Sequence, residues 1–148
     1  MAQSTIAAKP ALKITRTYAA PREKAFRAWT DPEVMKKWLA PSDEFAVPEV
    51  TADVRVGGKY RIVMRASDGE YHRVGGIYRE VLPPLKLVFT WAWESTPERQ
   101  SLVTVEFKDR GQSTELILTH EGFADEAARD KHQQGWNGCL GRLQACLG

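Results

Sequence analysis

The three histidines of this sequence are the side chains best suited to proton transfer near neutral pH. His72 falls in a segment predicted as a central strand, and His120 ends another predicted strand beside Glu121. If both faced one cavity together with Glu80 or Glu121, they could act as acid and base or bind a metal ion. The alternative, which we favour, is that they are hydrogen-bonded at the rim of a pocket. We therefore expect no catalytic residue, no metal site and no cofactor.

His132 precedes Trp136 by one helical turn in the last predicted helix. It could orient a bound ligand, or it could cap the sheet edge at the mouth of a cavity. No motif for other chemistry accompanies it: the sequence has no phosphate-binding loop, Rossmann glycine pattern, H-E-x-x-H or G-x-S-x-G. We expect any chemistry to depend on how these three histidines are surrounded.

The composition excludes several classes of protein. The net charge is +2, and basic residues are scattered among acidic ones without interleaved aromatics, which argues against nucleic-acid binding. No apolar run approaches the ~20 residues that a membrane span needs. The first residues, M-A-Q-S-T-I-A-A-K-P, lack the basic start and apolar block of a signal peptide. We expect a cytoplasmic protein.

The two cysteines agree with that compartment. Cys139 and Cys146 are seven residues apart in a predicted helix, or about 10.5 Å along its axis. A disulfide requires Cα atoms within ~7 Å, so they cannot pair with each other there. Neither has a neighbour at metal-binding spacing. We interpret both as small, buried, apolar residues.

The elements that must position these side chains follow from the periodicity of apolar residues. Pro48 predicts a bulge or an edge position in its strand, and Gly75-Gly76 predicts a bend. Tight turns between consecutive strands predict a mainly antiparallel sheet in an α+β fold. The predicted order is a strand (11–18), two short helices (21–30 and from Asp31 to before Pro41), six strands (45–56, 59–65, 70–82, 85–94, 101–108 and 114–120) and a long helix (125–147).

The long helix carries one apolar face that includes Trp136 and Leu140, and we take Asp125 as its N-cap. Its three glycines each cost a helix interior roughly 0.8–1 kcal/mol against alanine, so packing must hold it. Gly135 predicts a close approach of helix and sheet. Gly138 and Gly141 predict extra room beside Trp136.

Large aromatic residues dominate the predicted inward faces of the strands. On period alone they could fill a solid core, or they could line a cavity between a curved sheet and the long helix. Ligand cavities are mostly apolar with a few polar groups. The candidate ligand-binding residues are Trp38, Tyr60, Ile62, Met64, His72, Phe89, Trp91, Trp93, Phe107, His120, His132, Trp136 and Leu140.

Several segments, in their order and spacing, resemble one protein family. The chain is similar to the SRPBCC or START-like superfamily, which has the helix-grip fold of the birch-pollen allergen. Within it, the chain resembles the family named for the C-terminal domain of the activator of heat-shock protein 90 ATPase. The matching segments are T-R-T-Y-A-A-P-R-E-K-A-F-R-A-W-T-D-P-E-V-M-K-K-W (15–38), V-G-G-K-Y-R-I-V-M-R (56–65), G-I-Y-R-E-V-L-P-P-L-K-L-V-F-T-W (76–91), V-T-V-E-F-K-D-R-G-Q-S-T-E-L-I-L-T-H-E-G-F (103–123) and G-W-N-G-C-L-G-R-L (135–143).

The resemblance implies a curved antiparallel sheet of about seven strands wrapped around the C-terminal helix, with two short helices after the first strand and a cavity inside. We expect a flexible leader at residues 1–10 and one START-like domain at 11–148. The chain is expected to bind a small hydrophobic molecule. The alternative is a polyketide cyclase/aromatase-like or hydrolase-like enzyme that uses the same cavity.

A third alternative is a co-chaperone for the heat-shock protein 90 ATPase. We favour it least, because the family's namesake binds the chaperone through a separate N-terminal domain for which this chain has no room. We expect neither nucleic acid nor membrane as a partner. An exposed edge strand at Leu12–Tyr18 or Phe45–Val56 could pair two copies into a homodimer.

Overall fold

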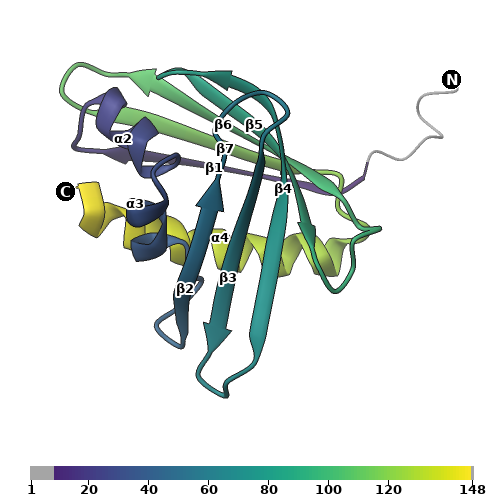
Figure 1. Ribbon diagram of the computed structural model, residues 1–148. Helices are drawn as coiled ribbons and strands as arrows, with labels where there is room; N and C mark the ends of the chain where they lie inside the picture. Colours follow the sequence, from purple (N-terminus) through teal and green to yellow (C-terminus); the bar gives the residue numbers. More distant parts are fainter. Residues whose placement is uncertain (1–8, 148) are drawn as a thin grey trace, which may run out of the picture.

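A computed structural model describes residues 9–147 of the chain (Figure 1). Of the expected leader, residues 1–8 lie outside the described part, whereas the carbonyl oxygen of Pro10 accepts a hydrogen bond from the backbone of Phe123. The elements are β1 (Ala11–Tyr18), α2 (Arg22–Ala28), α3 (Pro32–Trp38), β2 (Phe45–Ala52), β3 (Lys59–Ala66), β4 (Tyr71–Leu82), β5 (Lys86–Trp93), β6 (Ser101–Asp109), β7 (Thr114–Glu121) and α4 (Glu126–Leu147).

The seven strands form one antiparallel sheet in the order β1-β7-β6-β5-β4-β3-β2. The sheet curves around α4, while α2 and α3 lie near the C-terminal end of that helix (Figure 1). This arrangement confirms the expected α+β helix-grip fold. The two edge strands are β1 and β2, as the sequence indicated.

One face of α4 holds the helix against the sheet. Its buried residues are Trp136, Cys139, Leu140, Leu143 and Leu147, which recur at the period of a helix face. The helix begins as predicted, because the carboxylate of Asp125 accepts the backbone N–H of Ala128 at 2.8 Å. No helix among residues 9–147 is long and apolar enough to cross a membrane.

The glycines of α4 differ from expectation. A Cβ atom on Gly138 would lie 1.9 Å from the carbonyl oxygen of Pro41, so Gly138 admits the backbone of the loop after α3 and leaves no extra room. A Cβ on Gly135 would meet only the Pro41 side chain, at 3.7 Å. Gly141 faces open space. The close approach therefore occurs at Gly138 and not at Gly135. It brings α4 against the loop after α3, whereas an approach to the sheet was expected.

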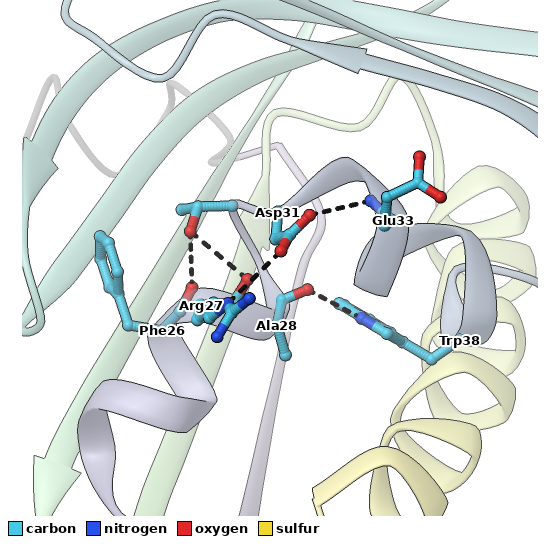
Figure 2. A network of polar contacts seen from close by, with 7 residues as sticks. Phe26, Arg27, Ala28, Asp31, Glu33 and Trp38 are labelled. Carbon is cyan, nitrogen blue, oxygen red and sulfur yellow. Dashed lines mark hydrogen bonds and ion pairs between the residues drawn. The ribbon is translucent and has the colours of Figure 1, made fainter.

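The two short helices meet at a polar junction (Figure 2). The carboxylate of Asp31 accepts the backbone N–H of Glu33 at 3.0 Å and pairs with Arg27. The indole Nε1 of Trp38, at the end of α3, donates to the carbonyl oxygen of Ala28 at 2.9 Å. This bond fixes α3 on α2 and so fixes where the loop that follows α3 approaches α4.

Two irregularities shape the sheet. The register of β2 and β3 shifts between Ala46 and Glu49, which confirms the disturbance predicted at Pro48. The shift between β4 and β5 lies between Tyr78 and Glu80, so the bend predicted at Gly75-Gly76 comes a few residues later. Gly76 has another role, since a Cβ there would lie 2.0 Å from the carbonyl oxygen of Thr90.

Candidate functional site

A cavity of about 670 Å³ lies between α4 and the half of the sheet that carries β4 and β5. Strands β3, β4 and β5 line one side of the cavity, α4 lines the opposite side, and the loop after α3 closes one end. Its rim is exposed, with Tyr71 at 47% of its full accessibility. The lining residues are Leu39, Pro41, Phe45, Met64, Glu70, Tyr71, His72, Arg73, Trp91, Trp93, Glu94, Ser95, Thr96, Lys131, His132, Gly135, Trp136 and Cys139.

Three tryptophans, Trp91 and Trp93 of β5 and Trp136 of α4, form an aromatic wall in this cavity. The rings of Trp91 and Trp136 lie 5.1 Å apart between centroids, and those of Trp91 and Trp93 lie 5.8 Å apart and nearly perpendicular. Trp136 also stacks on Trp29 at 5.8 Å. Because Trp91 and Trp136 are each packed against two other indoles, this part of the wall is rigid. Trp91, Trp93 and Trp136 are brought together as the sequence predicted.

His132 is joined to this wall by a hydrogen bond. The indole Nε1 of Trp93 donates to Nε2 of His132 at 2.9 Å, while Nδ1 of the same ring lies 2.7 Å from the carbonyl oxygen of Ala128. The neutral ring therefore carries its hydrogen on Nδ1, which donates to Ala128. Burial lowers the pKa of His132, and nearby Lys131 acts in the same direction. His132 thus lines the cavity as a neutral side chain whose two nitrogens are both engaged.

His120 lies in a closed network. The indole Nε1 of Trp136 donates to its Nδ1 at 3.0 Å, and its Nε2 lies 2.7 Å from the hydroxyl of Ser101. That hydroxyl donates to the carbonyl oxygen of Trp91 at 3.1 Å. Burial lowers the pKa of His120 to about 2, with His132 contributing. Fully buried and outside the cavity lining, His120 is structural, which argues against the acid/base role considered for it.

His72 is the histidine that reaches the rim. Its side chain keeps 40% of its accessibility, lies 3.9 Å from the carboxylate of Glu70 and packs edge-on against Phe45. At the same rim, Glu94 is held by Arg61 at 2.7 Å, and that hydrogen bond lowers the pKa of Glu94. No cluster of three or more potential metal ligands occurs within residues 9–147. The rim therefore offers polar contacts of both charges.

The remaining predicted residues divide into three groups. Met64 lines the cavity beside His72, its partner across β3 and β4. Tyr60, Ile62 and Phe89 lie behind Trp91, where they surround a void of only about 20 Å³. These three contribute to the support of the aromatic wall, and the void is too small for a ligand.

Three predicted residues fall in the solid core, away from the cavity. Trp38 packs on Trp29, Phe107 packs on Phe26, and the backbone oxygen of Leu140 accepts the hydroxyl of Tyr18 at 2.8 Å. Each is at most 1% exposed, because α2 and α3 fill that end of the half-barrel. Facing inward was not sufficient for a place on the cavity wall.

Sequence reasoning missed the residues that close the cavity from loops. Leu39 and Pro41 come from the connection between α3 and β2, Phe45 is the first residue of β2, and Thr96 comes from the loop after β5. Loop residues carry no periodic signal, so no pattern could place them. Cys139 could have been predicted as a lining residue, since it lies three residues after Trp136 on the same helix face.

Two other hollows border α4. One, of about 360 Å³, lies toward the start of the helix and shares Trp93 and His132 with the cavity just described. The other, of about 710 Å³, lies at the C-terminal end and has short apolar side chains with a basic rim that includes Lys24 and Lys37. It is larger, but it lacks an aromatic wall, so the cavity at Trp91 is the candidate site.

Comparisons with known proteins agree with this architecture. A model of the family described as "Activator of Hsp90 ATPase homolog 1-like protein" matches residues 19–148. A comparison with curated proteins finds no match.

Several solved structures have the same fold. Protein CV1439 from Chromobacterium violaceum is 27% identical over 93% of this chain and 97% of its own, with a TM-score of 0.83. The AHSA1 protein from Silicibacter pomeroyi is 28% identical over 93% and 97%, with a TM-score of 0.81. CalU16 from Micromonospora echinospora is 24% identical over 93% and 76%, with a TM-score of 0.71, a likeness of fold.

Proposed function

The chain belongs to the family of Activator of Hsp90 ATPase homolog 1-like proteins, and from this premise we propose that it binds a small hydrophobic molecule between its sheet and α4. One observation carries the proposal. A cavity of about 670 Å³ opens beside an aromatic wall built from Trp91, Trp93 and Trp136. Cavities that take small ligands typically measure about 300–1,000 Å³ and are mostly apolar.

The wall supports binding of a flat or flexible apolar body. Trp136 and Trp91 are 3% and 5% exposed and form the tightly packed back of the cavity, whereas the partly buried Trp93 offers a more accessible indole face. Burying apolar surface gains roughly 25 cal/mol per Å² before the costs of association are subtracted. The affinity is therefore expected to come from contact with this wall.

The polar groups near the wall are suited to orientation. Both nitrogens of His132 are already hydrogen-bonded within the protein. The groups free to meet a polar part of the ligand lie at the rim, among them His72 and Lys131. We infer that the apolar part of the ligand lies against the aromatic wall, while its polar part meets free side chains such as Lys131. The closed network around His120 gives the cyclase or hydrolase alternative no acid or base at that position.

The test uses a glycine of the cavity wall. Gly135 lines the cavity and its Cβ would have one ordinary contact, so Gly135→Leu should fit the helix and occupy ligand space. We expect it to weaken binding of the fluorescent probe anilinonaphthalene sulfonate at least about tenfold. Gly141→Leu is the matched control, because Gly141 faces open space on the same helix.

Native mass spectrometry of the freshly purified protein should also detect a co-purified small molecule, which Gly135→Leu should lose. If both leucine variants bound the probe as the parent does, binding would occur elsewhere and the cavity assignment would fail.

A further inference from the structure

Two hollows on either side of Trp93 and His132 share one wall. The candidate cavity of about 670 Å³ lies on one side, and the hollow of about 360 Å³ near the start of α4 lies on the other. The second hollow is closed by the loop after β5 and by the segment between β7 and α4. The residues that line both are Trp91, Trp93, Thr96, Lys131 and His132.

A single side-chain hydrogen bond closes the centre of this wall, from Nε1 of Trp93 to Nε2 of His132 at 2.9 Å. The imidazole is fixed on the helix, because its Nδ1 is bonded to the backbone of Ala128. Trp93 is the last residue of β5 and is only partly buried. Of the two bonded side chains, the indole of Trp93 is therefore the one that can move without disturbing a strand or a helix.

Trp91, which lines both hollows, has an unmet hydrogen-bond donor. Its side chain is 5% exposed, and its buried Nε1 has no acceptor among the described residues. Buried donors in native proteins are nearly always paired, so an orphan calls for an explanation. A ligand oxygen that reached this nitrogen would supply the missing acceptor.

The charges of the second hollow indicate which ligand end would fit. Its charged lining residues are Arg99, Asp125 and Lys131. Asp125 is occupied as the N-cap of α4, whereas neither Arg99 nor Lys131 forms a salt bridge with any residue from 9 to 147. The available charge is positive, which complements a carboxylate or another anionic group.

We propose that the second hollow is a subsite for the anionic end of an elongated amphiphile, and that the Trp93–His132 pair is the partition this ligand displaces. The apolar body of the ligand then lies along Trp91 and Trp136 in the first cavity. The pair sets ligand length, because a short ligand occupies the first cavity and leaves the partition closed. The inference rests on the proposed ligand-binding function.

The first experiment compares ligand lengths in a displacement assay with anilinonaphthalene sulfonate, using octanoic and hexadecanoic acids. Trp93→Phe keeps an aromatic ring but removes the donor, so hexadecanoic acid should bind about threefold to tenfold more tightly, the gain expected for one hydrogen bond that no longer has to be broken. Octanoic acid should bind as before. Tyr18→Phe is the control, because it keeps an aromatic ring and removes a buried hydrogen bond between residues that line neither hollow.

The second experiment tests the charge. Replacing Arg99 and Lys131 together by glutamine should weaken hexadecanoic acid at least about threefold and leave its methyl ester unaffected. Replacing the exposed Lys13 of β1 and Lys59 of β3 together by glutamine is the control for the same change of net charge. Equal losses for acid and ester would overturn the anionic subsite.

A third measurement uses the parent protein alone. In ¹⁵N-labelled parent protein, hexadecanoic acid should shift the indole N–H signals of both Trp93 and Trp91, whereas octanoic acid should leave that of Trp93 in place. Two results together would refute the partition while the proposed function stood. They are an equal change in the affinity of both acids in Trp93→Phe, and a shift of the Trp93 signal of the parent by both acids. If neither acid displaced the probe, this inference would fail while the proposed function stood. If the parent protein did not bind the probe, the proposed function would fail and this inference with it.

Discussion

The indole Nε1 of Trp136 donates a hydrogen bond to Nδ1 of His120 across 3.0 Å, and this bond joins the middle of α4 to the end of β7. Because Nδ1 accepts, the hydrogen of the neutral imidazole lies on Nε2 and points to the hydroxyl of Ser101. A protonated ring would place a second N–H against the indole N–H. The fold therefore requires His120 to be neutral, and stability should depend on that state.

The first prediction concerns acid. The pKa of His120 falls from 6.5 to about 2 on folding, so below pH 6.5 the unfolded chain binds a proton that the folded chain does not. The contribution of neutral His120 to the free energy of unfolding is present in full above pH 6.5. It is lost as the pH falls below that value, at about 1.4 kcal/mol per pH unit. His120→Asn, which keeps an acceptor near Nδ1, should remove this part of the slope. Urea unfolding at pH 7 and pH 5 measures it.

His72→Asn is the control for that experiment, since His72 is partly exposed and lies outside the network. This variant leaves the network of His120, Ser101 and Trp136 intact, so it controls for the loss of a histidine elsewhere. A parent slope unchanged by His120→Asn would mean that His120 is not the buried titrating group.

The second prediction compares the two tryptophan–histidine bonds. Trp136→Phe leaves Nδ1 of His120 buried without a donor, which should cost about 1–3 kcal/mol beyond the loss of ring contacts. Trp93→Phe removes the same kind of bond to His132, where the cavity admits water, so its cost should stay below about 1 kcal/mol. Urea unfolding decides between them, and equal losses would contradict the burial difference.

The third prediction concerns the glycines of α4. Gly138→Ala should destabilise the protein by about 2 kcal/mol or more, because its Cβ would lie 1.9 Å from the carbonyl oxygen of Pro41. Gly141→Ala has free space and should stabilise it by up to about 0.8–1 kcal/mol through helix propensity. Thermal unfolding of the two variants should therefore shift in opposite directions. A stabilising Gly138→Ala would show that the loop after α3 does not press on the helix.

The fourth prediction concerns the cysteines. Burial raises the pKa of the Cys139 thiol to about 12, and the residue is 5% exposed, so it should resist alkylation even though it lines the cavity. Cys146 is partly exposed and should react more than about tenfold faster with iodoacetamide at pH 8. Mass spectrometry of the native protein gives both rates, and Cys146→Ser isolates the slower one. Comparable rates would mean that the cavity exposes the Cys139 thiol.

The sequence by itself determined the elements and their order. Asp31 and Asp125 marked helix starts, and the alternation of strands such as Lys59–Ala66 gave the antiparallel sheet, because both signals are local. The apolar stripe through Trp136 identified α4 as the helix that the sheet covers. Within that frame, the phase of Trp91, Trp93 and Trp136 predicted that they face inward.

The tertiary structure alone decided which inward residues meet the cavity. Trp38, Phe107 and Leu140 face inward but are covered by neighbouring elements, whereas Pro41 reaches the cavity from the loop after α3. It also decided that His120 is neutral and enclosed, since that depends on a donor from α4 and a hydroxyl from β6. Periodicity reports the direction of a side chain along its own element. A cavity and a pKa depend on what arrives from elements distant in the chain.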